Sequence, residues 1–397
     1  MESLERNIIL NTIQYGRQDI NQADIDAVVA VLRSDFLTQG PVVPAFEKAV
    51  SNYCGAQQAV AVNSATSALH IACLALGVGK GDIVWTTPIT FVASANCALY
   101  CGAMVDFVDI DPLTYNINVE HLAEKLSLAK IAGKLPKVVI PVHLCGQPCD
   151  MVGIHELSQK YGFKVIEDAS HAIGGKYKGE PIGNCRYSDI TVFSFHPVKI
   201  ITSGEGGMAL TNDTILANRL CLLRSHGITS TAEEMESRPV QEIWNYQQID
   251  LGFNYRMTDI QAALGLSQMK RLDEFVSKRH IIAKQYHQKL SNLPIAAPLQ
   301  HADSYSSYHL YVIRLKLKNI IKSQREVYDS LRSAGIMVNL HYIPVYRQPY
   351  YEKMGFSKGY CQFAESYFSE AISIPMYASF TESEQDQVIN ALVSATT

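Results

Sequence analysis

One lysine stands in a segment that could give it unusual chemistry. Lys199 follows a predicted strand within Phe193-Ser-Phe-His-Pro-Val-Lys-Ile-Ile-Thr-Ser-Gly-Glu-Gly-Gly207, a stretch that is apolar at first and rich in glycine at its end. Burial would disfavour the ammonium form and lower the pKa of this lysine. A neutral amine can attack an aldehyde and form a Schiff base. A surface lysine in a loop is the plainer alternative, and Lys199 alone does not decide between them.

A carboxylate at the end of another predicted strand favours the Schiff-base reading. Asp168 ends the apolar part of Val165-Ile-Glu-Asp-Ala-Ser-His171, and a buried carboxylate needs a compensating partner. The protonated ring nitrogen of pyridoxal phosphate (PLP) would be such a partner, and its charge makes the ring an electron sink. The alternative is an Asp that caps a helix, but Ala169-Ser-His-Ala172 is a poor helix start.

Two further segments could hold the phosphate and the ring of this cofactor. In Asn63-Ser-Ala-Thr-Ser-Ala-Leu69 a strand ends and a helix begins, and free N–H groups with the helix dipole would attract a phosphate. Phe91 follows the next predicted strand, where it could stack on a flat heterocycle or equally belong to the core. The glycine-rich segment 77–81 looks like a nucleotide loop, but a strand follows it, so we expect a plain turn.

Length and composition exclude several classes of protein. The chain has 397 residues, of which 47% are hydrophobic and 18% charged, which suits two or three domains rather than disorder. A net charge of −4 without runs of like charge gives no support to a nucleic-acid interface. No apolar run approaches the ~18 residues of a membrane span, and the first residues lack a signal-peptide core. We therefore expect a cytoplasmic protein that binds neither nucleic acid nor membranes.

The cysteines give no clear signal for a disulfide framework or a metal site. There are nine, an odd number scattered along the chain. Cys145 and Cys149 have metal-like spacing, but no second Cys/His pair accompanies them. We expect reduced thiols and no metal.

The first two thirds of the chain alternate strand-like and helix-like segments. Seven short apolar runs are typical of strands buried on both faces, as in a sheet covered by helices on both sides. A helix capped by Asn21 is expected to bury a stripe from Ile25 to Leu32, and another helix covers about 65–76. This order predicts an α/β domain with a mainly parallel seven-stranded sheet. The predicted strands are Ala59–Asn63, Asp82–Thr87, Met104–Ile110, Val138–Leu144, Phe163–Asp168, Ile190–Phe195 and Met208–Thr211.

The pattern changes near Met257. One long helix is predicted from there to about Leu290, and the remainder alternates strand and helix as a smaller α+β domain. We therefore expect a large cofactor-binding domain (1–256), a connecting long helix (257–290) and a small C-terminal domain (291–397). The small domain is predicted to contain strands His309–Leu315, Met337–Tyr342 and Ile372–Ile374 and helices Gln324–Ser333, 360–369 and Glu382–Val393.

The segments around Lys199, Asp168, Thr66 and Phe91 together resemble the fold-type-I PLP enzymes. More narrowly, the chain resembles the DegT/DnrJ/EryC1/StrS family of sugar aminotransferases over nearly its whole length. Further stretches carry this resemblance: Tyr15-Gly-Arg-Gln18, Asp35-Phe-Leu-Thr-Gln-Gly-Pro41, Gly252-Phe-Asn-Tyr-Arg-Met-Thr-Asp259 and His341-Tyr-Ile-Pro-Val-Tyr346.

The resemblance implies a role for each residue of a PLP site. Lys199 would form the Schiff base and shuttle a proton, Asp168 would pair with the pyridine nitrogen, and Phe91 would stack on the ring. Residues with small or hydroxyl side chains would bind the phosphate: Ala65, Thr66 and Ser194.

Other implied residues extend the site beyond the cofactor ring and the large domain. His171 stands near the expected ring hydroxyl, where relatives often have Gln. Asn254 would reach the phosphate site of a neighbouring subunit in a homodimer. His341 and Tyr342 would contact the nucleotide sugar, although a plain strand and turn would explain these two equally well. Ala65 departs from the Gly of many relatives but keeps the backbone N–H.

The resemblance also implies the reaction. L-glutamate would convert PLP to pyridoxamine phosphate (PMP), and the 4-keto group of a UDP-4-keto-6-deoxy-N-acetylhexosamine would accept the amine. Another nucleotide-sugar 4-aminotransferase, of bacillosamine or perosamine type, is the main alternative. A PMP-dependent sugar dehydratase would have His in place of Lys199, and a regulator would need an added DNA-binding segment.

Overall fold

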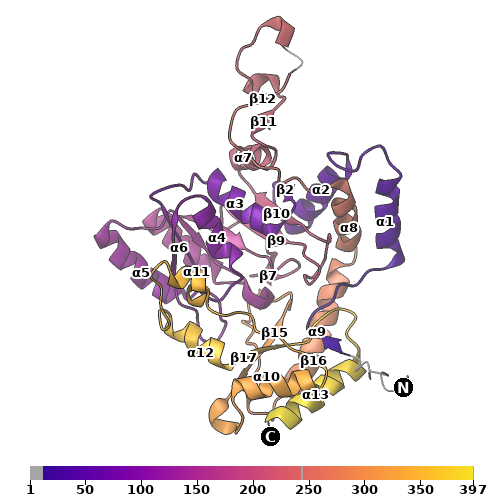
Figure 1. The fold of residues 1–397 in the computed structure, drawn as a ribbon, viewed down its shortest axis with the longest axis vertical. Coiled ribbons are helices and arrows are strands. Elements are labelled where there is room, and N and C mark those ends of the chain that lie inside the picture. Colours follow the sequence, from indigo (N-terminus) through magenta and orange to yellow (C-terminus); the bar gives the residue numbers. More distant parts are fainter. Residues whose placement is uncertain (1–11, 243–244, 397) are drawn as a thin grey trace, which may run out of the picture.

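A seven-stranded sheet lies at the centre of the computed structural model, which describes residues 12–242 and 245–396 (Figure 1). All neighbouring strands pair in parallel except β10, which is antiparallel to both of its neighbours. The predicted fold class, a mainly parallel α/β sheet, is therefore confirmed. From edge to edge the strands are β2 (Gln58–Val62), β10 (Gly207–Thr211), β9 (Ile190–Ser194), β6 (Lys164–Asp168), β5 (Val138–Ile140), β3 (Ile83–Thr86) and β4 (Met104–Phe107).

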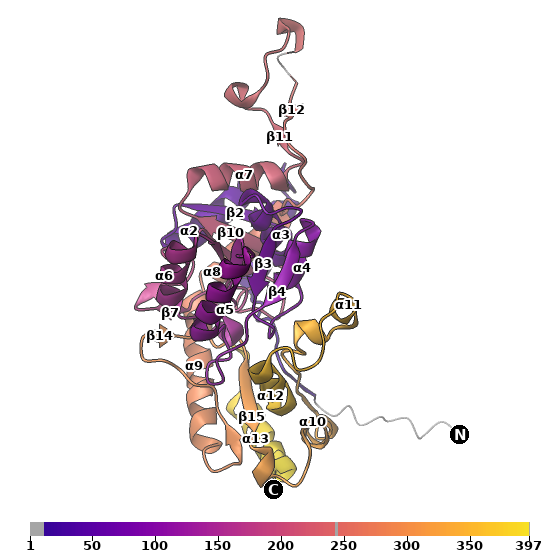
Figure 2. The same cartoon turned by 90° about the vertical axis from the view of Figure 1, so that its left-hand side faces the viewer.

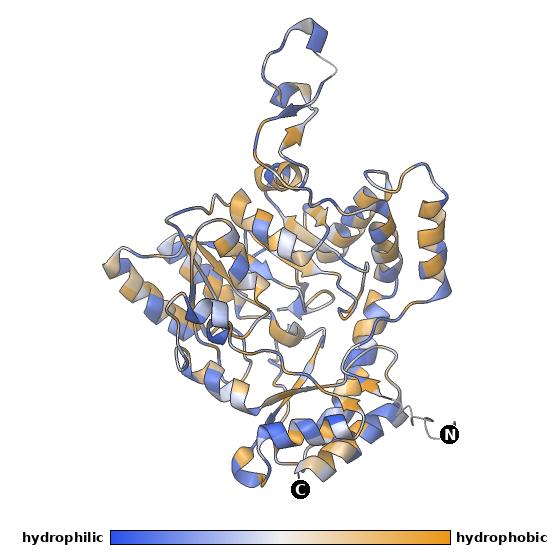
Figure 3. Cartoon of the chain, viewed as in Figure 1, coloured by the Kyte–Doolittle hydropathy of each residue, from blue (hydrophilic) through white to orange (hydrophobic). Residues whose placement is uncertain are grey.

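Alternating side chains give the sheet two apolar faces. Val60 and Val62 of β2 pack with α3, α4 and α7, whereas Ala61 between them packs with α2 and α8. Helices α5 and α6 cover the far half of this second face through residues such as Leu126 and Ile154. Burial on both sides explains why the strands are mostly hydrophobic in Figure 3. The helices are α2 (Val42–Cys54), α3 (Ala65–Ala75), α4 (Ala93–Tyr100), α5 (Val119–Ala132), α6 (Met151–Tyr161), α7 (Thr214–Arg224) and α8 (Asp259–Met269).

The C-terminal third has a core of its own. A three-stranded antiparallel sheet in the order β13-β15-β17 packs with helices there. The predicted strand Met337–Tyr342 is wrong in extent, because only Ile336–Met337 is a strand and the rest is an irregular loop. The elements are β13 (Ile295–Ala296), β15 (Tyr311–Leu315), β16 (Ile336–Met337), β17 (Ala371–Ile374), α10 (Gln324–Ser333), α11 (Pro349–Glu352), α12 (Gln362–Glu370) and α13 (Glu382–Thr396).

The start of the chain joins this C-terminal part. Strand β1 (Ile13–Gln14) pairs in parallel with β16, and Ile13 belongs to the C-terminal core. The division into a large domain (1–256), a connecting segment (257–290) and a small domain (291–397) stays a prediction, and the β1–β16 pairing places residues 13–14 beside the predicted small domain.

The predicted single helix over 257–290 is two helices. α8 ends at Met269 and α9 runs over Leu272–Lys289, with Lys270 and Arg271 between them. α8 packs on the central sheet and α2, whereas the later turns of α9 bury Ile282 and Tyr286 in the C-terminal core. The first turns of α9 still pack in the same core as α8, through Leu272, Phe275 and Val276.

A long arm leaves the body of the molecule beyond α7, with the β11–β12 ribbon at its base (Figures 1 and 2). The first and last described segments, β1 and α13, lie at the opposite pole, in the C-terminal part. Within residues 12–242 and 245–396, no helix is long and apolar enough to cross a membrane. The remaining strands are β7 (Lys176–Tyr177), β8 (Glu180–Pro181), β11 (Ile228–Thr229), β12 (Gln247–Gln248) and β14 (Ser304–Tyr305).

Helix α1 (Gln22–Leu32) is attached by a buried carboxylate rather than by its apolar stripe. Ile25 and Leu32 are 47% and 54% exposed, contrary to the prediction, whereas Asp24 is 1% exposed. Asp24 accepts hydrogen bonds from Ser267 Oγ at 2.6 Å and Arg271 Nη2 at 2.6 Å. Burial acts to raise the pKa of Asp24, but these hydrogen bonds and the Arg271 charge bring it below its ordinary value.

Replacing Asp24 with Asn should lower the free energy of unfolding by about 2–3 kcal/mol at neutral pH, because hydrogen bonds to a charged acceptor are lost. The pKa of Asp24 is lower in the folded protein than in the unfolded chain, where it is near 3.9. This difference stabilises the fold fully at pH values above about 3.9, and the stabilisation is lost as the pH falls through the pKa of the folded state. The gap in melting temperature between wild type and D24N should therefore narrow in acid. Asp26→Asn is the matched control, since Asp26 is exposed on the same helix. Equal melting of wild type and D24N at neutral pH would contradict this assignment.

Candidate active site

A cavity of about 1070 Å³ opens where the carboxyl ends of β6 and β9 meet the start of α3. Ligands of parallel α/β sheets bind at this end of the strands. The cavity is lined by every site residue proposed from the sequence except Asn254, namely Ala65, Thr66, Phe91, Asp168, His171, Ser194, Lys199, His341 and Tyr342. Residues more than 270 positions apart are thus brought together, while their individual roles stay predictions.

Lys199 lies in a turn that follows β9, where its N–H donates to the His196 carbonyl at 2.9 Å. Burial lowers the pKa of Lys199 from 10.5 to about 8, and the negative charge of Asp168 opposes this fall. The Lys199 amine therefore loses its proton far more readily than an exposed lysine. This is the property that a Schiff-base lysine needs.

Asp168 is the last residue of β6 and is 4% exposed. Its Oδ2 accepts a hydrogen bond from Ser94 Oγ at 2.6 Å, and its Oδ1 accepts one from the Ser170 N–H at 3.1 Å. Within the described chain, Asp168 forms no ion pair. Each oxygen keeps a second acceptor position, so the site can take a charged donor from a ligand.

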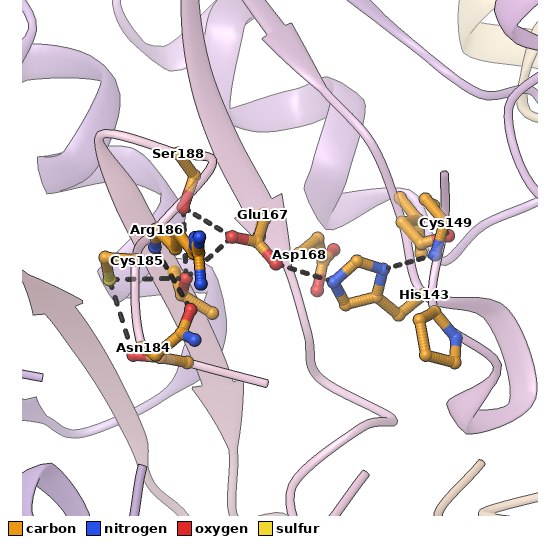
Figure 4. A network of polar contacts seen from close by, with 12 residues as sticks. His143, Cys149, Glu167, Asp168, Asn184, Cys185, Arg186 and Ser188 are labelled. Carbon is orange, nitrogen blue, oxygen red and sulfur yellow. Dashed lines mark hydrogen bonds and ion pairs between the residues drawn. The ribbon is translucent and has the colours of Figure 1, made fainter. Parts of the chain in front are cut away.

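A buried network fixes the strand ends behind Asp168 (Figure 4). The neighbouring Glu167 binds His143 Nε2 at 2.8 Å and accepts a hydrogen bond from Ser188. The Cys149 N–H donates to His143 Nδ1 at 3.1 Å, so the imidazole proton lies on Nε2 and points to Glu167. Burial acts to raise the pKa of Glu167, but the bonds from His143 and Ser188 hold it below its ordinary value. The network ties β6 to the end of β5 and keeps Asp168 in place.

The start of α3 has free N–H groups of the kind that the predicted anion site needs. Ser64 caps the helix by accepting a hydrogen bond from the Ser67 N–H at 3.1 Å. The N–H groups of Ala65 and Thr66 have no partner within the helix, because the first turn lacks preceding carbonyls. A Cβ on Gly207 would lie 2.4 Å from the Ala65 nitrogen, so this glycine permits β10 to approach the helix start.

His171 is held in one tautomer. Its Nδ1 accepts a hydrogen bond from the Cys145 N–H at 3.2 Å, which leaves the proton on Nε2, 3.3 Å from the Tyr342 hydroxyl. Burial, together with the charges of Lys199 and His341, keeps the pKa of His171 well below its usual range. His171 is therefore a neutral hydrogen-bonding group that connects the large domain to the C-terminal part.

Two further imidazoles in the cavity are also neutral. Burial lowers the pKa of His341 to about 3, and its Nδ1 lies 2.8 Å from Ser373 Oγ. His309 lies 4.4 Å from His171 between ring centroids, and burial keeps its pKa well below the usual range. Among the residues that the structure describes, the buried His309 Nδ1 has no hydrogen-bond partner. An orphaned nitrogen in a ligand cavity is explained if a ligand or water satisfies it.

Phe91 and Asn254 occupy contrasting positions. Phe91 is 58% exposed yet lines the cavity, with its ring 6.4 Å from that of Tyr342. Such a ring is free to stack on a ligand. Asn254 is exposed outside the cavity of its own chain, where its carbonyl lies 3.5 Å from Asn63 Nδ2.

The residues present fit PLP. The α3 start suits its phosphate, Asp168 suits a protonated pyridine nitrogen, and Lys199 has an amine that is poised for the aldehyde. The buried carboxylate without an ion pair is the observation that fits best, because a ring cation would compensate it.

Sequence reasoning missed Thr90, Ser94 and His309. Thr90 and Ser94 carried a detectable signal, since two hydroxyl residues four positions apart flank Phe91 and therefore share one helical face. His309 carried none, because nothing near it in the sequence indicates that it meets His171.

The amine reactivity of Lys199 in cofactor-free enzyme should rise with a midpoint near pH 8, because burial lowers its pKa to about 8. Amine-selective labelling at a series of pH values, followed by mass spectrometry of the Lys199 peptide, measures this midpoint. Asp168→Asn should move the midpoint to lower pH, since the Asp168 charge favours the ammonium. A midpoint near 10.5 would mean that Lys199 is fully solvated.

Comparison with known proteins agrees with this geometry. Residues 18–393 match the model of the DegT/DnrJ/EryC1/StrS aminotransferase family. The chain is 37% identical to the UDP-4-amino-4,6-dideoxy-N-acetyl-beta-L-altrosamine transaminase of Campylobacter jejuni over 96% of this chain and 97% of that protein. It is 36% identical to the GDP-perosamine synthase of Caulobacter vibrioides, over 89% and 90% of the two chains.

A solved structure shows the same likeness at the level of the fold. Helicobacter pylori PseC, an aminotransferase involved in the biosynthesis of pseudoaminic acid, superposes with a TM-score of 0.87 at 29% identity, over 97% of this chain and 99% of that chain. Both the family match and this superposition span the Lys199 and Asp168 segments. The chain therefore belongs to the DegT/DnrJ/EryC1/StrS family and is a PLP-dependent sugar aminotransferase.

Proposed function

We propose that the enzyme transfers an amino group from L-glutamate to C4 of a UDP-4-keto-6-deoxy-N-acetylhexosamine. The product would be UDP-4-amino-4,6-dideoxy-N-acetyl-β-L-altrosamine, an intermediate on the way to pseudaminic acid. The observation that carries amino transfer is the presence of Lys199 and Asp168 in one cavity. The substrate choice is supported by the full-length likeness to the Campylobacter jejuni transaminase and to PseC.

The large domain supplies the groups for proton transfer. Bound PLP supplies an electron sink and carries the amino group between the two substrates. Of the described residues that line the cavity, Lys199 alone has a primary amine. Its Nζ would take the proton from Cα of the donor and deliver one to C4 of the acceptor. Its lowered pKa suits both tasks, because the neutral and charged forms are close in free energy near neutral pH.

The C-terminal part supplies neutral polar groups that suit a sugar. Asn339, His341, Tyr342 and Gln348 line the cavity, as does Tyr15 from the start of the chain. Because the pKa of His341 is lowered to about 3, it would meet the substrate as a hydrogen-bonding group and not as a cation. Hydroxyl and acetamido groups of the sugar would pair with such side chains.

Asn254 is the basis for proposing a shared site. It is exposed and does not itself line the cavity of its own chain, although its carbonyl lies 3.5 Å from Asn63 Nδ2 at the edge of that cavity, so we propose that it serves the phosphate site of a second copy. The nearby Tyr246 and Leu251 are 66% and 76% exposed. Apolar side chains of this kind would be covered in a homodimer.

A different nucleotide sugar is the second candidate. The likeness to a GDP-perosamine synthase at 36% identity favours an acceptor with the same 4-keto group but another nucleotide and no acetamido group. Lys199 and Asp168 would act in the same way, so only the sugar contacts separate the two candidates.

The enzyme should prefer the β-L-arabino 4-keto sugar over its D-xylo epimer by kcat/KM, with L-glutamate as donor. A wrong epimer leaves buried polar groups unpaired at about 1–3 kcal/mol each, or roughly 5- to 150-fold per group. Mass spectrometry and NMR of the products identify the amino sugar. Lys199→Ala, which lacks the reactive amine, is the control for enzyme-independent amination. Preference for the D-xylo sugar, or for a GDP-linked acceptor, would replace the proposed substrate and leave the cofactor residues untouched.

Mixed dimers should recover activity if Asn254 serves a neighbouring site. Inactive Lys199→Ala and weakened Asn254→Ala proteins, dissociated and re-associated together, would form heterodimers with one site free of both lesions. Activity should rise above that of either variant alone, and re-association of each variant with itself is the control. A fully active monomer, shown by light scattering during turnover, would end this proposal.

A further inference from the structure

We infer that Ser94, supported by Thr90, is a positioning residue that orients the Asp168 carboxylate toward the cofactor ring nitrogen. The inference rests on the proposed role of Asp168. It assigns a function to two buried hydroxyl groups, Thr90 at the cavity lining and Ser94 behind it, that the proposed reaction does not otherwise use.

The donor and the acceptor of each hydrogen bond between Thr90, Ser94 and Asp168 can be assigned. Asp168 has no proton to give as a carboxylate, so Ser94 must donate across the 2.6 Å contact to Oδ2. The Ser94 hydroxyl has one proton, and the Thr90 hydroxyl lies 2.8 Å from it. Thr90 therefore donates to Ser94. The order Thr90 to Ser94 to Asp168 polarises each hydroxyl toward the carboxylate.

The burial of both hydroxyl groups lets these hydrogen bonds fix the orientation of the Asp168 carboxylate. Ser94 is 0% exposed and Thr90 3% exposed, so solvent does not compete for their protons. With Ser94 on Oδ2 and the Ser170 N–H on Oδ1, the carboxylate is held at both oxygens. Its plane is then fixed before any ligand arrives, which avoids an ordering cost on binding.

The same segment also places the stacking ring. Thr90, Phe91 and Ser94 lie within about one turn, and the Ser94 N–H donates to the Phe91 carbonyl at 3.3 Å. Phe91 and Thr90 both line the cavity, and the Thr90 hydroxyl reaches Ser94, which contacts Asp168. One short segment therefore positions the Asp168 carboxylate and the Phe91 ring relative to each other.

The test compares matched hydroxyl deletions in enzyme reconstituted with ring-15N-labelled PLP. Ser94→Ala should shift the ring-nitrogen 15N NMR signal toward the unprotonated form and lower kcat about 10- to 100-fold, the effect of losing a hydrogen bond to a charged group. Thr90→Val should change both in the same direction by less, and Thr90→Ser, which keeps the donor, should restore wild-type behaviour. Thr86→Val is the control, since Thr86 Oγ1 is a buried hydroxyl that donates to the Ile140 carbonyl, away from Asp168.

The outcomes separate this inference from the proposed function. If Asp168→Asn leaves the ring-nitrogen signal unchanged, the role of Asp168 is wrong. If Asp168→Asn shifts the signal but Ser94→Ala and Thr90→Val leave it and kcat at wild-type values, the positioning role is wrong. Should Ser94→Ala fail to fold, as judged by circular dichroism, the Thr90→Val and Thr90→Ser pair decides the question by the same signal.

Discussion

A buried carboxylate that forms no ion pair with any described residue is the constraint on which the rest of the site depends. Asp168 sits at the carboxyl end of β6 and receives hydrogen bonds from a side chain and from the backbone, yet these neutral donors do not cancel its charge. Such a group is costly unless a cation joins it. A protonated pyridine ring is a cation of the right shape and chemistry for this cavity. The strand, its neighbours and the network around Glu167 all keep that anion where a ring nitrogen can reach it.

The electrostatics of the cavity follow from burial. The imidazoles of His171, His309 and His341 are neutral because burial and the nearby Lys199 disfavour their charged forms. Lys199 and Asp168 are therefore the buried groups that can bring charge to the cavity, whereas Glu205 lines it from a largely exposed position. Proton transfer can be confined to Lys199, while the histidines hold and orient without exchanging protons near neutral pH. Substrate recognition by neutral hydrogen bonds then depends on how completely each polar group finds a partner.

Two parts of the molecule meet at the cavity. The central sheet contributes the cofactor groups, and the C-terminal part contributes the loop with His341 and Tyr342, of which Tyr342 packs against the core of the central sheet. The contact between His171 and Tyr342 crosses this boundary. Because β1 pairs with β16, Tyr15, which follows β1 near the start of the chain, lines the same cavity. Sugar-contacting groups can therefore differ between family members while the cofactor groups stay in place.

The sequence alone predicted the features that depend on local pattern. Apolar runs buried on both faces predicted all seven strands of the sheet, and the change from strand to small hydroxyl residues predicted the start of α3. Residues at strand ends, such as Asp168 and Lys199, were found because the end of an apolar run is visible in the sequence and parallel strands end at the same edge.

The tertiary structure decided what depends on distant segments. The break at Lys270 and Arg271 separates two helices that share one core at first, since only the later turns of α9 reach the C-terminal core. α1 is held through Asp24, since its carboxylate finds Arg271 and Ser267 more than 240 residues away. In the same way, the contact of His309 with His171 and of Ser94 with Asp168 joins residues whose own neighbourhoods carry no sign of the partner. Local sequence sets propensity and periodicity, but only the folded chain determines which buried polar groups meet.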